Sequence, residues 1–152
     1  MGDQMRSLNI SRQAKKIKVN DRGDYITLNF GDQRFIPELL ALMDELTKSQ
    51  PDNIARSAEI DAMPEGTREE SLAKIAANAA FNLELCTYLQ RRVDEIFRDD
   101  VCRKVFGDVV PSLDAFYEFF DQLGEVIRGF KRELDEDLQK RIGRYTDKYT
   151  KR

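Results

Sequence analysis

Hydrophobic and polar residues alternate along two short stretches near the N-terminus of the chain. The apolar positions are Ile17 and Val19 in the first stretch, then Ile26, Leu28 and Phe30 in the second. A period of two is typical of a β-strand that buries one face. The sequence therefore predicts a β-hairpin over residues 15–30, preceded by a flexible arm over residues 1–14.

Between the two stretches lies Asp21–Asp24, where Gly23 can adopt the positive φ that a tight turn needs. With Arg22 and Gly23 at the turn centre, the expected pairs are Val19 with Ile26 and Ile17 with Leu28. A lone hairpin is marginal in water, and no later segment repeats the alternation strongly. Its apolar face is therefore expected to lie on a helix, while its edges stay open to another chain.

From residue 37 onward the apolar residues recur at the spacing of an α-helix. Pro37 suits the first turn of a helix, and a helix is predicted over residues 37–49. Pro51 is expected to interrupt or restart this helix, after which a weaker stripe of small residues continues to Met63.

A second, longer helical pattern covers residues 67–106. Thr67 and Glu70 match a capping box at its start, in which each side chain satisfies an unpaired backbone amide of the first turn. A break is expected at Arg98–Asp100, where three charged residues follow one another.

The last helix is predicted to begin after Ser112, a favourable N-cap residue, and to continue to about residue 142. Its apolar positions follow a heptad repeat: Leu113, Phe116, Phe120, Leu123, Ile127, Phe130 and Leu134. At 1.5 Å per residue this helix would be on the order of 45 Å long, so it either protrudes or is covered by a partner at its far end.

These patterns predict a mainly α fold: a helical bundle with one N-terminal β-hairpin and a long C-terminal helix. Residues 1–152 are expected to form a single domain, with a helical body over 37–142 and a basic C-terminal tail over 143–152. From residue 140 to residue 152 there are six bases and one acid, which is favourable at the C-terminal end of a helix dipole.

The amino-acid composition limits the catalytic and metal-binding chemistry that the side chains can supply. The 152 residues include no His, which removes the commonest general base and metal ligand, and no nucleotide-binding or zinc motif is present. We therefore expect no enzyme, no cofactor and no metal site.

Asp and Glu number 28 against 25 Lys and Arg, which argues against a nucleic-acid partner. Without a signal peptide or an apolar run of about 20 residues, a cytoplasmic protein with no membrane contact is expected. Cys86 and Cys102 are interpreted as buried thiols.

The aromatic residues are more informative, because residues 116–120 contain four rings. Phe116 and Phe120 lie on the heptad face, and Tyr117 and Phe119 flank it on opposite sides. This broad stripe is either buried in the protein's own core or partly a surface for another protein. On the second interpretation, Phe119→Asp would weaken partner binding and leave the monomer folded, whereas Phe120→Asp would damage the fold. The candidate protein-binding residues, which include the continuation of the stripe, are Tyr117, Phe119, Val126, Tyr145 and Tyr149.

The order of these features resembles a known family. A hairpin, several helices, and a Phe106-Gly107-Asp108 turn before Pro111-Ser112-Leu113 and a helix rich in Phe are similar to the tail assembly chaperones of long-tailed (siphovirus-like) bacteriophages of Gram-positive hosts. The resemblance covers roughly residues 15–135. It implies a non-enzymatic, self-associating protein of the host bacterial cytoplasm, which coats the tape measure protein and helps recruit tail tube subunits.

A second hypothesis remains open beside the chaperone. The hairpin edges and the over-long helix are equally compatible with a self-associating helical structural or connector protein that has no chaperone role. Both hypotheses predict a homo-oligomer.

Overall fold

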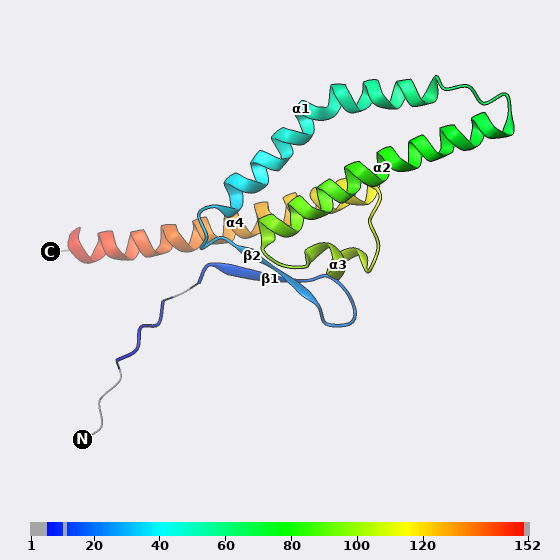
Figure 1. The fold of residues 1–152 in the computed structure, drawn as a ribbon. Helices are drawn as coiled ribbons and strands as arrows, with labels where there is room; N and C mark the ends of the chain where they lie inside the picture. The colour runs from blue at the N-terminus through cyan, green and yellow to red at the C-terminus, as the bar shows by residue number, and fades with distance from the viewer. Residues whose placement is uncertain (1–5, 11, 151–152) are drawn as a thin grey trace.

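The computed structural model describes residues 6–10 and 12–150, and side chains at 134, 137–139 and 141–150 are outside its description. Its elements are β1 (Ala14–Lys18), β2 (Tyr25–Asn29), α1 (Phe35–Asp61), α2 (Arg68–Phe97), α3 (Val101–Phe106) and α4 (Leu113–Thr150) (Figure 1). The predicted class, a mainly helical fold with an N-terminal hairpin, is confirmed. Of the predicted arm, residues 1–5 and 11 are outside the description, and the others before β1 have no regular secondary structure.

The hairpin has a register two residues away from the predicted one. Ile17 lies opposite Ile26, rather than opposite Leu28. The reason is Asn20, whose side-chain oxygen accepts hydrogen bonds from the backbone amides of Arg22 (2.8 Å) and Asp24 (3.3 Å), so that the loop is longer than a two-residue turn. Because side chains alternate with a period of two, a shift of two keeps the same residues on the buried face.

The buried face of the hairpin packs on helices, as predicted. Ile26 is 2% exposed and Leu28 is fully buried, and β2 contacts both α2 and α3. The Asn20 amide donates to the carbonyl of Lys104 at 3.0 Å, which ties the loop to α3. Gly23 has a φ of 90°, the positive value expected for it.

Helix α1 begins two residues before Pro37 and continues through Pro51 as one helix, so the predicted interruption is wrong. Proline removes one backbone hydrogen bond and bends a helix, but it need not end one. Figure 1 shows that α1 is bent, and Pro51 lies within this helix. Leu42 and Ile60 are buried on either side of Pro51, and this packing keeps both halves in place.

Helix α2 begins and ends as predicted. Thr67 caps it by accepting a hydrogen bond from the Glu70 amide at 3.1 Å. At its other end Arg98 adopts a left-handed conformation with a φ of 54°, which separates α2 from α3. The Arg98 guanidinium reaches Glu38 of α1 at 3.2 Å and so links the end of α2 to the start of α1.

The core gathers residues from β2 and all four helices. Phe97 lies between Phe35 and Phe119, with ring centroids 5.2 and 6.5 Å away, and Phe106 lies 5.8 Å from Phe119. No polar side chain is buried among the described residues. Cys86 and Cys102 are buried and not joined by a disulfide, as expected. Burial raises the pKa of both thiols.

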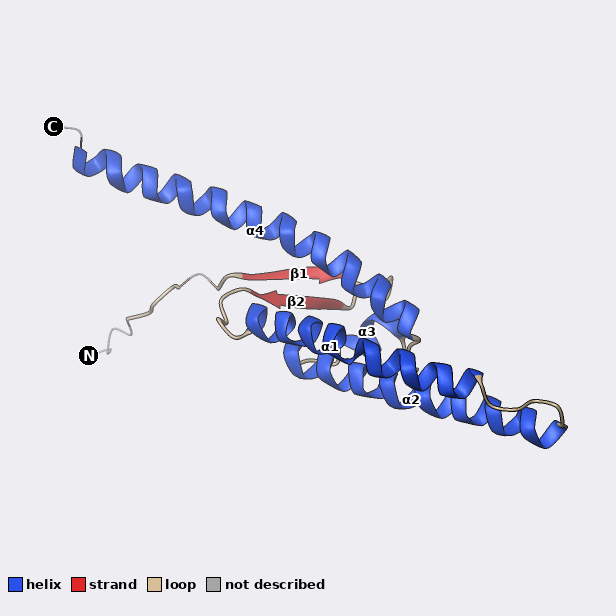
Figure 2. Cartoon of the chain, turned by 90° about the horizontal axis from the view of Figure 1, so that it is seen from above, coloured by secondary structure: helices blue, strands red, loops and turns tan. Residues whose placement is uncertain are grey.

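The two ends of the molecule extend in opposite directions from this core. Helices α1 and α2 run antiparallel, and residues 52–84, here called the distal hairpin, project at one end (Figures 1 and 2). Helix α4 runs in the same general direction as α2, and its C-terminal half projects at the other end. The helix includes the predicted basic tail as far as Thr150. At 1.5 Å per residue its 38 residues span about 57 Å.

Candidate protein-binding groove

The structure places one predicted binding residue in the core. Phe119 is only 9% exposed, and its ring contacts those of Phe97, Phe106 and Phe120. Helix α4 turns the side between Phe116 and Phe119 toward the core, rather than the side between Phe116 and Phe120. The prediction that Phe119 lies on an open flank is therefore wrong.

Of the other four predicted residues, the structure describes the side chains of two, Tyr117 and Val126. Tyr117 is 50% exposed, whereas Val126 is partly buried against the core. Tyr145 and Tyr149 belong to α4, but their side chains lie outside the described part of the chain. The binding role of these residues stays a prediction.

An open apolar groove lies between α1 and α4, on the other flank of the aromatic stripe. It has a volume of about 190 Å³. Its lining comprises Ile36, Leu39, Leu40 and Met43 from α1, with Phe120, Leu123, Gly124, Ile127 and Lys131 from α4. Leu40 is 62% exposed, so one wall of the groove presents a large apolar side chain to solvent. All but one of the residues that line the groove are uncharged, and two helices supply them together.

Gly124 gives the groove its width on the α4 side. A Cβ built on Gly124 would meet only the Arg128 guanidinium, at 3.8 Å, which is an ordinary contact. Glycine inside a helix costs stability, on the order of 0.5–1 kcal/mol relative to alanine, and allows another backbone to approach closely. A glycine within a heptad repeat is thus a sequence signal for this groove.

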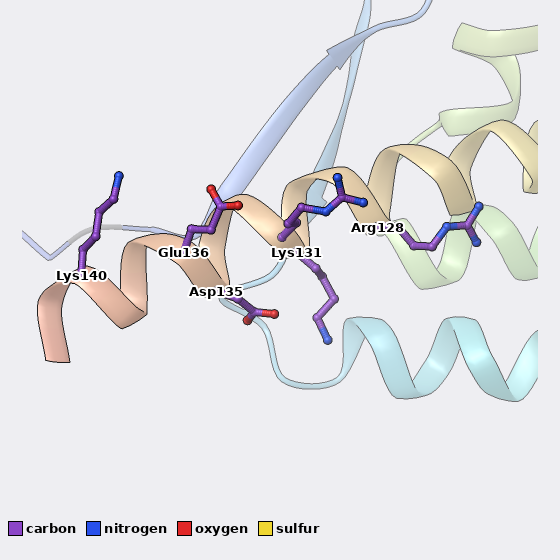
Figure 3. A pocket seen from close by; sticks show the side chains of 6 residues that line it. Arg128, Lys131, Asp135, Glu136 and Lys140 are labelled. Carbon is purple, nitrogen blue, oxygen red and sulfur yellow. The ribbon is translucent and has the colours of Figure 1, made fainter. Parts of the chain in front are cut away.

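Lys131 supplies the one charge in the groove lining. Figure 3 shows its side chain directed toward the N-terminal end of α1, while the side chains of Glu136 and Lys140 project to the opposite side. Arg128, Asp135, Glu136 and Lys140 belong to a mixed-charge face that comes from α4 alone. One helix surface with both signs of charge does not enclose a ligand, so this face is solvated helix surface.

A polar network fixes α1 against α2 and thereby positions the α1 wall of the groove. Glu45 accepts hydrogen bonds from the Tyr88 hydroxyl at 2.8 Å and from the Arg92 guanidinium at 3.0 Å. The bond from Tyr88 and then the bond from Arg92 lower the pKa of Glu45, and the same carboxylate raises the pKa of Tyr88. These groups are partly exposed, so the network orients the two helices more than it stabilises the fold.

The described residues contain no group of three or more Cys, Asp or Glu side chains placed to hold a metal ion. No described helix combines the length and the apolarity that crossing a bilayer requires.

The groove is therefore the surface on which a functional hypothesis can be built, because it is apolar, open and shared between two helices. Comparison with protein-family models, with curated proteins and with solved structures found no match to this chain.

Proposed function

We propose that this protein is a non-enzymatic assembly chaperone that holds an amphipathic helix of a partner protein in the groove between α1 and α4. The observation that carries the proposal is the open apolar lining, with Leu40 on one wall and Gly124 on the other. Apolar helix faces dock into grooves of this kind through residues spaced three and four apart. Lys131 would meet an acidic side chain at the edge of such a helix.

The chemistry of the groove favours broad rather than sequence-specific recognition. Apart from Lys131, its side chains offer no charge, so affinity would come from the apolar area that the partner buries. A groove that requires only an apolar stripe can bind at many different places along a long helical protein. This property suits a chaperone that keeps such a protein from aggregating.

The partner we propose is the tape measure protein of a long-tailed bacteriophage, with tail tube subunits recruited afterward in the host cytoplasm. This identification rests on the resemblance of the Phe106–Asp108 turn and the aromatic helix after it to phage tail assembly chaperones. The groove itself supports the coarser proposal, an apolar helix as ligand.

Filling the groove without disturbing the core tests the proposal. Gly124→Leu would occupy the groove and, by removing a helical glycine, should leave the protein at least as stable as the unmodified chain. Gly129→Leu is the matched control, because a Cβ there meets nothing within 4 Å and the residue does not line the groove. Each variant would be co-expressed with the tape measure protein from the same genome.

We expect the unmodified chain and Gly129→Leu to co-purify with the tape measure protein and to raise its soluble fraction. Gly124→Leu should do neither. If Gly124→Leu performs like the control, the groove is not the binding site. If no version binds the tape measure protein, the chaperone proposal fails and the structural or connector hypothesis gains ground.

A further inference from the structure

The first half of α2 carries an apolar stripe that nothing in the described chain covers. We call it the distal stripe; it comprises Leu72, Ile75, Ala79 and Leu83. Leu72, Ile75 and Leu83 are 55%, 64% and 56% exposed. The same row continues along α2 through residues that are buried: Cys86, Leu89, Val93 and Ile96. One stripe of a single helix is therefore buried in its second half and open in its first.

The arrangement of the fold explains the difference. The β-hairpin and α4 cover the second half of α2. Because α4 starts beside the middle of α2, neither element reaches the distal stripe (Figures 1 and 2). Helix α1 lies on another side. Its contacts with α2 run through Phe81, which lies under Arg56 at 4.8 Å, and through Tyr88. At 100° per residue, Phe81 and Tyr88 point away from the distal stripe.

Charge indicates what covers the stripe. Residues 59–70, at the tip of the distal hairpin, contain five acids and one base. Residues 140–152, which we call the basic end, contain six bases and one acid. The sequence leading through the basic end also keeps apolar residues at helical spacing: Leu134, Leu138, Ile142, Tyr145 and Tyr149. The basic end therefore combines an apolar repeat, which could cover the distal stripe, with a positive charge that is complementary to the acidic tip of the distal hairpin.

This contact cannot form within one molecule. The distal hairpin and the C-terminal half of α4 project at opposite ends of the structure (Figures 1 and 2). A helix of this length is rigid, so the C-terminal half of α4 does not fold back onto the distal hairpin of the same molecule. The two surfaces can meet only when they belong to different copies.

We propose that the C-terminal half of α4 of one copy packs on the distal stripe of a second copy. The contact joins two different surfaces and is therefore heterologous, so that copies assemble head to tail into a chain or a closed ring. It does not use the groove between α1 and α4, and so it does not depend on the proposed function.

Two complementary variants test the contact. Ile75→Asp with Leu83→Asp would disable the stripe, and Leu138→Asp with Ile142→Asp would disable the helix that covers it. Val109→Asp is the control, because Val109 is 56% exposed and lies outside both surfaces. Far-UV circular dichroism and urea unfolding would establish that every variant is folded. Sedimentation velocity over a range of concentrations would then give the mass of each one alone, and of the two disabled variants mixed in equal amounts.

We expect the unmodified chain, Val109→Asp and Gly124→Leu to form assemblies larger than a monomer. Each disabled variant alone should associate at least about 100-fold more weakly, because a charge would enter an apolar interface. Mixed together they should form a heterodimer and nothing larger, since one intact stripe and one intact helix remain. A monomeric unmodified chain, assemblies that survive either double substitution, or a mixture without heterodimer would each overturn the proposal.

Discussion

Replacing Phe119 by alanine removes a ring at the centre of the aromatic cluster between α2, α3 and α4. The side chain is 9% exposed, with three other phenylalanine rings 5.8 to 6.5 Å from its centroid. Phenylalanine-to-alanine substitutions in protein cores cost about 3–5 kcal/mol, through lost burial and the cavity that remains. Domains of this kind are stable by about 5–15 kcal/mol in total, so a large share of the free energy of unfolding would be lost.

Tyr117→Ala is the matched control, because Tyr117 lies two residues away on the same helix and is half exposed. We expect it to cost less than about 1 kcal/mol, the usual range for a surface substitution. For a chain of about 150 residues each kcal/mol lowers Tm by roughly 2–4 °C, so Phe119→Ala should lower it by about 6–20 °C.

Urea and thermal unfolding, followed by far-UV circular dichroism at low protein concentration, measure both effects. Equal and small losses for the two variants would show that Phe119 is not a core residue. The packing of α4 described above would then be wrong.

Three further predictions concern other parts of the chain. The fold lowers the pKa of Glu45, so this residue contributes about 1 kcal/mol or less to the free energy of unfolding at pH values above 4.5, the ordinary pKa of a Glu carboxyl. This contribution is lost as the pH falls below 4.5. Glu45→Gln should make stability depend less on pH in this range, as measured by urea unfolding at a series of pH values. Cys86 and Cys102 should resist a thiol reagent at mildly alkaline pH until denaturant is added, and rapid labelling of the native protein would contradict their burial. Gly107→Ala should destabilise by about 1 kcal/mol or more because Gly107 has a φ of 87°, whereas the helical Gly129→Ala should stabilise by about 0.5–1 kcal/mol; equal effects would refute the backbone explanation.

Local signals in the sequence predicted much of the fold. Thr67 with Glu70 located the start of α2, and Ser112, which accepts a hydrogen bond from the Ala115 amide at 3.2 Å, located the start of α4. These features depend on residues three apart in the sequence. The hairpin register escaped prediction because Asn20 sets it through bonds to its own loop and to Lys104, a residue far away in the sequence.

The candidate site was harder to predict, because it depends on how helices rotate against one another. Periodicity identified an aromatic stripe on α4 but left open which of its flanks faces α2. Phe119 is buried in the core, so the open flank of the aromatic stripe is the one that contains Phe120 and Gly124. The adjacent Leu39 and Leu40 were a usable signal, since two neighbouring leucines on a helix cannot both enter the same core.

The distal hairpin also has a consequence for how the molecule opens. Among its described residues only Ile60 and Phe81 are buried, and neither belongs to the main core cluster. Regions with few buried contacts exchange their amide hydrogens through local openings that cost far less free energy than global unfolding. Amides of the distal hairpin should therefore exchange well before those near Leu89 and Val93, in the same continuous helix. Any protein that covers this region would slow that exchange, and hydrogen exchange would locate the covered residues along α2 one turn at a time.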